Sequence, residues 1–182
     1  MSRITKVTME TADNEQGALL AAIKGKLGMV PNFLAVLAQS PAALTSFLGL
    51  HEIAGSGALD AQTRERIAIA LADRNGCQYC LSAHTAIGRK SGLSDADMTA
   101  NRSGGSTDGR AAAAVAFALA LSEHKGELTE AEFSAVRNAG YSDAEIVEIV
   151  VHVGMNLLTN ILAKSTEVDI DFPKVALTAR AA

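Results

Sequence analysis

The stretch that decides the fold runs from Arg64 to His84 and reads RERIAIALADRNGCQYCLSAH. Its first half repeats apolar residues at the period of an α-helix, which predicts a helix over 60–74. Gly76 follows at the position where helices commonly end, and the pattern predicts a second helix over 77–91. Because the turn between them is tight, we expect the two helices to be neighbours, and an antiparallel arrangement fits.

The rest of the chain carries the same helical signals. Alanine is abundant, there are three prolines and no tryptophan, and apolar residues follow the helical period in most windows. Capping boxes open the last two windows, at Thr129 and Ser142. We predict a single all-α domain over residues 1–182, with an N-terminal arm at about 1–10, a C-terminal tail at about 167–182, and further helices at 13–27, 31–39, 40–54, 94–101, 108–124, 130–139 and 142–163.

Charge and composition exclude several classes of protein. The chain has 182 residues, of which 16 are basic and 20 acidic, for a net charge of −4 at pH 7. Since phosphate backbones and anionic lipids require a basic excess, we expect no nucleic-acid partner and no membrane partner. No apolar run approaches the roughly 20 residues of a membrane span, and the first ten residues lack the apolar core of a secretory signal. Two cysteines three positions apart do not form a secreted disulfide scaffold, so we expect a cytoplasmic protein.

Cys77 and Cys80 form a C-x-x-C pair at the start of the predicted helix 77–91. The unpaired amides and the dipole at a helix start stabilise a thiolate, and the spacing brings the two sulfurs within reach of a disulfide. His84 follows Cys80 by one turn on the same side, where an imidazole can take up or hold a thiol proton. The pattern therefore indicates thiol chemistry at this helix start.

Glu65 completes the candidate set. It lies 11 residues before Gly76, and His84 lies 8 residues after it, so their positions along two antiparallel helices differ by only about 4–5 Å. Glu65 also shares a stripe with Ala68 and Ala72 that should face the core. A carboxylate on an apolar stripe needs a reason, and a proton relay with His84 is one.

The spacing of Glu65, eleven residues, Cys77-x-x-Cys80, three residues and His84 resembles the active-site pattern of the carboxymuconolactone decarboxylase superfamily, in its AhpD-like alkylhydroperoxidase branch. The resemblance extends over about residues 28–175. It includes segments similar to the peroxidase-related members: Val30-Pro31-Asn32-Phe33, Ser40-Pro41, Asn156-Leu157-Leu158-Thr159-Asn160 and Glu167-Val168-Asp169-Ile170-Asp171-Phe172-Pro173.

The resemblance implies an AhpD-like helical bundle that forms homo-oligomers, commonly trimers or hexamers, and that reduces hydroperoxides without a cofactor or metal. By position, Cys80 would be the peroxidatic thiol, Cys77 the resolving thiol, and His84 with Glu65 the proton relay. A dithiol, thioredoxin-like or lipoyl electron donor would restore both thiols. One position departs from the pattern: Tyr79 stands where the archetypal member has a histidine. Tyrosine, with a pKa of about 10, shuttles protons poorly near neutral pH.

Other interpretations of the same residues stay open. The reaction could be that of a lyase or isomerase on a small lactone or keto acid, with Glu65 and His84 as acid and base. The protein could also be a non-catalytic redox sensor or a metal-binding oligomer, with zinc held by Cys77, Cys80 and His84. The thiols alone could be buried apolar-like groups. Glu65 alone could be a surface carboxylate paired with a nearby arginine, namely Arg64, Arg66 or Arg89.

The remaining polar residues receive structural interpretations. We expect His51 and His124 to be solvated at helix ends and His152 to be a core histidine bonded to a carbonyl. Tyr79 is interpreted as a packing or pocket-lining residue, and Ser82 as incidental. For Asn156 and Asn160, one turn apart, hydrogen bonds across a subunit interface and a capping or pocket role fit equally well.

Overall fold

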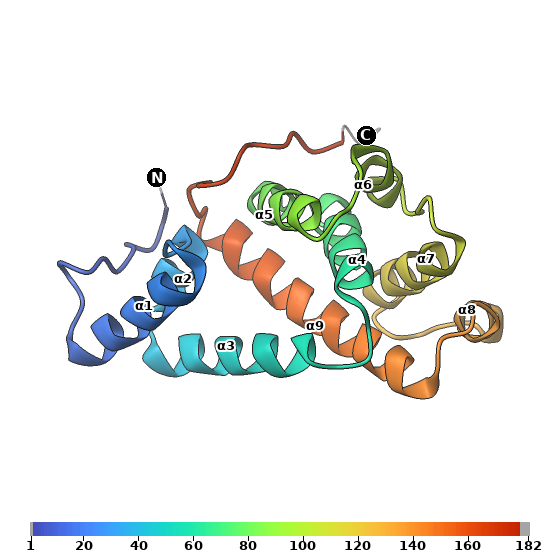
Figure 1. The fold of residues 1–182 in the computed structure, drawn as a ribbon, viewed down its shortest axis with the longest axis horizontal. Helices are drawn as coiled ribbons and strands as arrows, with labels where there is room; N and C mark the ends of the chain where they lie inside the picture. Colours follow the sequence, from blue (N-terminus) through green and yellow to red (C-terminus); the bar gives the residue numbers. More distant parts are fainter. Residues whose placement is uncertain (1, 179–182) are drawn as a thin grey trace.

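The computed structural model describes residues 2–178, and every regular element in that range is an α-helix (Figure 1). This confirms the predicted all-α class. The helices are α1 (Asn14–Leu27), α2 (Asn32–Leu37), α3 (Pro41–Gly55), α4 (Ala61–Arg74), α5 (Gln78–Lys90), α6 (Asp95–Arg102), α7 (Gly109–Glu123), α8 (Glu130–Asn138) and α9 (Asp143–Ser165).

Most helix starts are fixed by a side-chain cap, as the sequence indicates. Asp60 accepts a hydrogen bond from the Thr63 amide at the start of α4, and full capping boxes open α8 at Thr129 and α9 at Ser142. The predicted helix 31–39 is shorter than expected and ends at Leu37. The three residues after it form a turn, because Ser40 leaves helical geometry to cap α3.

Helix α4 lies at the centre of the molecule and separates two clusters of buried side chains. It packs against α5, α6, α7 and α9, and Ile67, Ile69 and Leu71 are fully buried. Ile69 belongs to the cluster beneath α5 and the N-terminal helices, whereas Ile67 and Leu71 belong to the cluster with α7 and α9. This central position holds any side chain on α4 rigidly with respect to α5.

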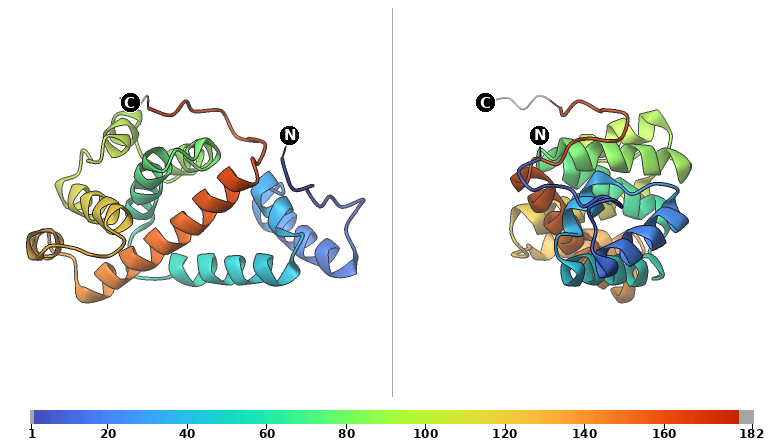
Figure 2. Two further views of the ribbon diagram at one scale, coloured as in Figure 1. Left: turned by 180° about the vertical axis from the view of Figure 1, so that it is seen from behind. Right: turned by 90° about the vertical axis from the view of Figure 1, so that its left-hand side faces the viewer.

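Helix α9 crosses the molecule diagonally, seen from both faces (Figures 1 and 2). By length and composition alone it is apolar enough to cross a membrane, so the expectation that no run approaches that length is wrong for this segment. In this fold it packs against α3, α4, α5 and α7 and buries the polar side chains of His152, Asn156 and Asn160. It is therefore a core helix here, with an outer face on which Val147, Leu158 and Ile161 are exposed.

The C-terminal tail, residues 167–178 of the described range, crosses over α5 toward α6 (Figures 1 and 2). Gln78 Nε2 donates to the Val175 carbonyl at 3.1 Å, and the Val175 amide donates to Ser82 Oγ at 3.1 Å. At its far end, Thr178 Oγ1 donates to Asp73 Oδ2 at 2.6 Å. The tail therefore lies over the surface, one of the two expectations for it, while the predicted residues 179–182 lie outside the described range.

The N-terminal arm also packs on the body of the protein. The buried Val7 donates its amide to the Ala35 carbonyl at 2.9 Å, and the Arg3 amide donates to the Thr166 carbonyl at 2.7 Å. Residue 1 of the predicted arm lies outside the described range.

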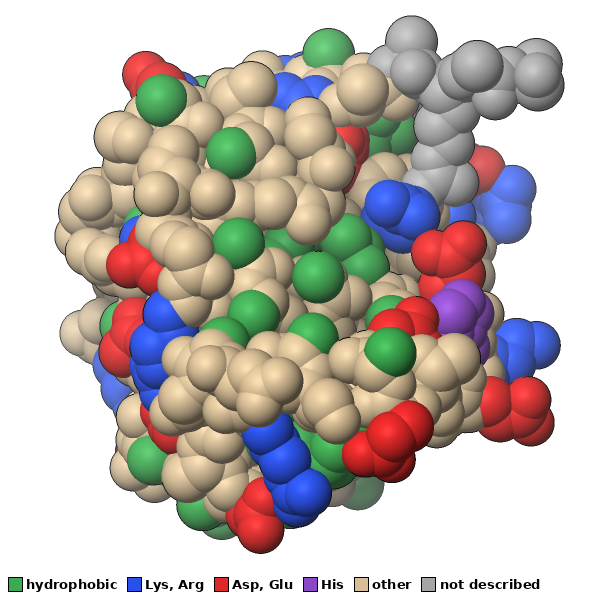
Figure 3. All heavy atoms as spheres, turned by 90° about the vertical axis from the view of Figure 1, so that its right-hand side faces the viewer, with side chains coloured by type: hydrophobic (Ala, Val, Ile, Leu, Met, Phe, Trp, Pro, Cys, Tyr) green, Lys and Arg blue, Asp and Glu red, His purple; other side chains and the backbone are tan. Residues whose placement is uncertain are grey.

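On the face at the α6–α8 end, acidic and basic side chains are interspersed, so no patch of one charge sign covers it (Figure 3).

Candidate active site

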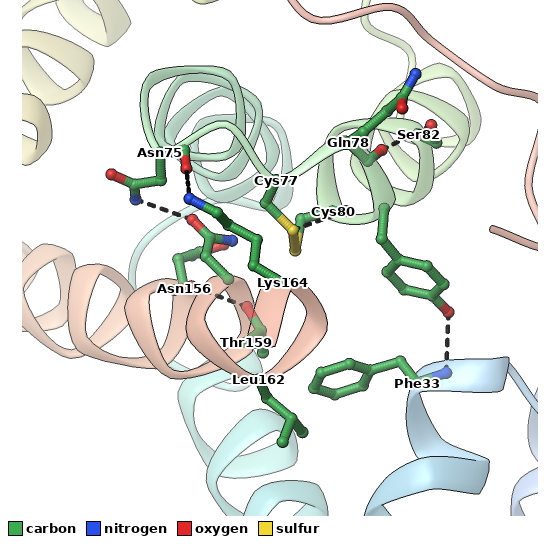
Figure 4. Close-up of a disulfide and its surroundings, with 12 residues drawn as sticks. Phe33, Asn75, Cys77, Gln78, Cys80, Ser82, Asn156, Thr159, Leu162 and Lys164 are labelled. Atoms are coloured by element: carbon green, nitrogen blue, oxygen red, sulfur yellow. Dashed lines mark hydrogen bonds between the residues drawn. A yellow bond between two sulfur atoms is a disulfide. The ribbon is translucent and has the colours of Figure 1, made fainter. Parts of the chain in front are cut away.

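Cys77 and Cys80 meet at the junction between α4 and α5 and are joined as a disulfide (Figure 4). Cys77 is the N-cap of α5, and its Sγ accepts a hydrogen bond from the Cys80 amide at 3.3 Å. Both residues are nearly inaccessible, with 1% and 4% of their surface exposed. The pair is thus a buried redox couple at a helix N-terminus, where free amides favour a thiolate.

Glu65 and His84 are in direct contact. Glu65 Oε2 lies 2.8 Å from His84 Nδ1, and both side chains are mostly buried, at 16% and 22% exposed. Helices α4 and α5 run antiparallel, since Gln62 near the start of α4 donates to the Ser91 carbonyl at the end of α5 at 3.0 Å. The expected juxtaposition of these two residues is therefore present, and the imidazole is oriented by the carboxylate.

Glu65 is not an ordinary surface carboxylate paired with a nearby arginine. Arg66 pairs with Asp97 at 2.8 Å, Arg89 pairs with Asp95 at 2.9 Å, and Arg64 donates to the Leu59 carbonyl. The stripe that Glu65 shares with Ala68 and Ala72 faces the core, where both alanines are buried. With its neighbours engaged elsewhere, the carboxylate is directed to His84.

Tyr79 packs among aromatic rings beside the disulfide. Its ring centroid lies 6.1 Å from Phe33 and 5.8 Å from Phe172, and its hydroxyl accepts a hydrogen bond from the Phe33 amide at 3.2 Å. Burial raises the pKa of Tyr79 above its usual value. The hydroxyl is therefore held as a neutral structural group, which agrees with the packing interpretation.

The other histidines have distinct surroundings. His152 Nε2 lies 3.3 Å from the Ala54 carbonyl, which confirms the carbonyl-bonded core histidine. His124 lies near Glu132, with Nδ1 3.6 Å from Oε1. His51 is exposed as expected, but partial desolvation, and after it the charge of His84, lowers its pKa.

Ser82, interpreted as incidental, has a structural function that the sequence did not indicate. Its hydroxyl donates to the Gln78 carbonyl at 2.8 Å and accepts from the Val175 amide at 3.1 Å, so it ties the tail to α5. Its partner lies 93 positions away, and no local pattern marks such a contact.

The two asparagines of α9 bond within the chain. Asn156 Nδ2 donates to the His152 carbonyl at 2.8 Å, and Asn160 Oδ1 accepts from Asn75 Nδ2 at 2.9 Å. Asn75 is the C-cap of α4. The amide of Asn160 therefore links α9 to the side chain of the C-cap residue of α4, and Asn160 also lines a hollow there, which agrees with the pocket interpretation.

The residues of the described range do not assemble a metal site. Within residues 2–178, no group of three His, Cys, Asp or Glu side chains lies close enough to hold a metal ion. Cys77 and Cys80 are bonded to each other. The zinc interpretation of Cys77, Cys80 and His84 thus has no supporting geometry.

Solved structures of similar fold support the superfamily. An uncharacterised peroxidase-related protein with an alkylhydroperoxidase AhpD core from Ralstonia eutropha is 25% identical, with a TM-score of 0.84 over 93% of this chain and 92% of that one. A peroxidase-related protein from a Silicibacter species is 26% identical, with a TM-score of 0.77 over 96% and 92% of the two chains. Residues 39–123 match the model of the carboxymuconolactone decarboxylase family. The family-model match and these two structures together support the carboxymuconolactone decarboxylase superfamily.

The same two structures support the AhpD-like branch, because the chain shares the helical fold of the AhpD core protein over nearly its whole length. A further structure of similar fold is that of a cysteine-to-alanine variant of the debrominase Bmp8, solved in complex with 2,3,4-tribromopyrrole. It is 18% identical, with a TM-score of 0.77 over 94% of this chain and 92% of that one, and this likeness concerns the fold alone. No curated protein matches the sequence.

Proposed function

We propose that this protein is a thiol-dependent peroxidase and disulfide reductase. The single observation that supports it best is the pairing of Glu65 with His84 at 2.8 Å, one helical turn beyond a disulfide-forming Cys77–Cys80 pair. The AhpD-like fold supports a peroxidase-related or lyase-type enzyme, and the sulfur pair favours the peroxidase.

The proposed reaction uses each of the four residues once. The Cys80 thiolate attacks the terminal oxygen of a hydroperoxide, the O–O bond breaks, and the alkoxide leaves as an alcohol with a proton from His84. Glu65 holds the imidazole in position and stabilises its charged form. Cys77 then attacks the sulfenic acid of Cys80, which forms the disulfide and releases water. Two electrons from an external dithiol restore both thiols.

The proposal extends to partners and setting. The hydroperoxide and a dithiol, thioredoxin-like or lipoyl donor would be the partners, and a reducing cytoplasm would keep the donor reduced. We also propose a homo-oligomer, a trimer or hexamer. It is supported by the apolar outer face of α9, where Val147 and Ile161 are 62% and 66% exposed.

Stopped-flow turnover of tert-butyl hydroperoxide with dithiothreitol tests the proposal. Cys80→Ser should lower the rate by at least about three orders of magnitude, because it removes the nucleophile. Cys77→Ser serves as the matched variant: reduced beforehand and assayed without dithiothreitol, it should consume one equivalent of hydroperoxide and stop at a sulfenic acid. Unchanged turnover in Cys80→Ser would show that the assignment is wrong.

A lyase or isomerase remains the second candidate, because the Glu65–His84 pair is a complete acid–base couple without either sulfur. It predicts turnover of a small lactone or keto acid that survives alkylation of both cysteines. The peroxidase predicts that alkylation abolishes turnover, so one treatment separates the two.

A further inference from the structure

Two hollows lie at the C-terminal end of α9, and the first of them reaches Cys77. The first measures about 330 Å³ and the second about 350 Å³, and Lys164 lines both. The first hollow is lined by Cys77, Gln78, Tyr79, Ala163, Lys164, Glu167, Val168 and Ile170. The second is lined by Asn75, Asn160, Ile161, Lys164 and Ser165. We call the two hollows together the groove: Cys77 lines the first hollow, polar side chains line most of the second, and Lys164 is common to both.

The polar end presents hydrogen-bond donors that the chain leaves unused. Asn160 is 2% exposed, and its Nδ2 has no hydrogen-bond partner in the described residues. Lys164 Nζ donates to the Asn75 carbonyl at 2.5 Å (Figure 4), which leaves further donors of the ammonium group. A buried amide N–H without a partner costs free energy, so a ligand acceptor at this point would be stabilising.

The charges at this end favour an anion through Lys164. No carboxylate of the described residues forms an ion pair with Lys164, and Glu167, which lines the first hollow, is paired with Arg3 at 2.6 Å. Helices α4 and α9 both end here, at Asn75 and Ser165, and the carbonyls of helix C-termini repel anions. The lysine is thus the group on which anion binding depends.

Access to the disulfide is narrow and one-sided. Cys77 and Cys80 are 1% and 4% exposed, which favours a donor sulfur carried on a slender group, such as a small thiol or a lipoyl arm, over one on a broad protein surface. The groove is lined by Cys77 but not by Cys80. A slender reductant entering there meets Cys77 first, and neither Glu65 nor His84 lines its path.

We propose that the groove binds a small thiol that carries a carboxylate, and that this thiol reduces the disulfide by attacking Cys77. This inference rests on the proposed function, because it names the electron donor of the same site. The donor thiolate forms a bond to Cys77 Sγ, the Cys77–Cys80 bond breaks, and Cys80 leaves as a thiolate. A second donor thiol then attacks the donor sulfur of the mixed disulfide. The donor is oxidised to its own disulfide, and Cys77 is released with a proton.

The reductive half-reaction alone tests this, starting from the oxidised protein without peroxide. The probes are 3-mercaptopropionate, 2-mercaptoethanol and cysteamine, which are anionic, neutral and cationic, with rates expressed per thiolate. We expect 3-mercaptopropionate to be about fivefold faster than 2-mercaptoethanol at low salt, and the advantage to shrink at 1 M salt. In Lys164→Gln the advantage should vanish, and cysteamine should become the fastest probe.

Two variants separate charge from structure. Lys164→Arg keeps the charge and should keep the preference. Lys90→Gln removes an exposed lysine from the last turn of α5, as Lys164 lies in the last turn of α9, and should leave the preference intact. A structural defect in Lys164→Gln would slow all three probes equally and leave their ratio unchanged. That outcome, or equal rates in the parent protein, would overturn the proposal.

The site of attack has its own readout. Rapid alkylation followed by mass spectrometry should find the donor on Cys77 and the alkyl group on Cys80, and the reverse labelling would contradict the inference. The outcome is distinguishable from failure of the peroxidase, since a protein that never reacts with hydroperoxide would still show this preference in thiol exchange.

Discussion

The two sides of the disulfide are built differently. On the side of α4 and α5 the polar side chains are satisfied: His84 contacts Glu65, the Tyr79 hydroxyl bonds the Phe33 amide, and Ser82 bonds both Gln78 and the tail. On the side of α9, Asn160 keeps a buried N–H without a partner beside an exposed lysine. We infer that the side of α4 and α5 holds the reacting groups in fixed positions, whereas the side of α9 has a free donor with which it can bind a molecule.

The largest of these effects should come from replacing Glu65, the carboxylate on the side of α4 and α5, and it should appear in peroxide turnover. Glu65→Gln keeps the shape of the side chain but can no longer stabilise a charged imidazole. We expect peroxide turnover to fall about a hundredfold. Stopped-flow measurement beside Glu123→Gln, an exposed carboxylate of α7 that pairs with Arg74, provides the comparison. Turnover within twofold of the parent would remove Glu65 from the mechanism.

The side of α4 and α5 also contains a buried ion pair, in which Arg66 of α4 binds Asp97 of α6. Asp97 is buried, and although burial alone raises its pKa, hydrogen bonds from the Thr107 amide and from Arg66 lower it to about 2. The folded pKa lies below the ordinary 3.8, so the stabilisation is fully present above about pH 4. It is lost as pH falls toward 2 and amounts to about 2 kcal/mol.

Urea unfolding of the oxidised protein from pH 6 to pH 2 measures this loss. Asp97→Asn should be less stable at pH 6 and should lack that part of the acid dependence. Asp95→Asn is the control. Asp95 lies two residues before Asp97, its side chain is 80% exposed, and its substitution should change the free energy of unfolding little. Identical acid profiles for the parent and Asp97→Asn would contradict the interpretation.

A smaller effect should follow at Tyr79. Tyr79→Phe keeps the ring packing but leaves the Phe33 amide without its acceptor, which should lower the free energy of unfolding by about 1 kcal/mol. Peroxide turnover should stay within about twofold, since the hydroxyl is held as a structural group. A large loss of turnover with unchanged stability would instead make the hydroxyl part of the chemistry.

The smallest effect should be local to the tail. Ser82→Ala removes the acceptor of the Val175 amide, so hydrogen exchange at that amide should accelerate while global stability falls by no more than about 1 kcal/mol. Exchange at the Ala35 amide, which donates to the Pro31 carbonyl within its own segment, serves as the internal reference. Unaltered protection at Val175 would show that the other bonds of the tail, from Gln78 to Val175 and from Thr178 to Asp73, hold it without Ser82.

Much of the fold was predictable because its signals are local. Asp60, Thr129 and Ser142 each cap the helix that follows, through bonds that reach only three residues along the chain. Glu65 and His84 could be placed together because a tight turn and the helical rise fix their relative positions. Most of the candidate site could therefore be predicted from the turn at Gly76 between α4 and α5.

The rest could not be predicted because it depends on single contacts between distant segments. The bonds of Ser82 to Val175 and of Asn75 to Asn160 join positions 93 and 85 apart, and neither belongs to a periodic pattern. The end of α2 was placed two residues too far along for a different, local reason: Gln39 and Ser40 bond to carbonyls three residues back, in a turn that helical periodicity does not distinguish from a helix. Whether a polar residue is engaged or left without a partner follows from packing alone.

The position of Cys77 as the cap of α5 bears on how the protein changes during a reaction cycle. Its sulfur accepts the Cys80 amide in the oxidised form, and a thiolate at the same point would accept it more strongly. The backbone of α5 can thus stay in place while electrons are gained and lost. Crystal structures of the two oxidation states should superimpose closely, and following turnover requires a probe of the sulfurs rather than of helix content.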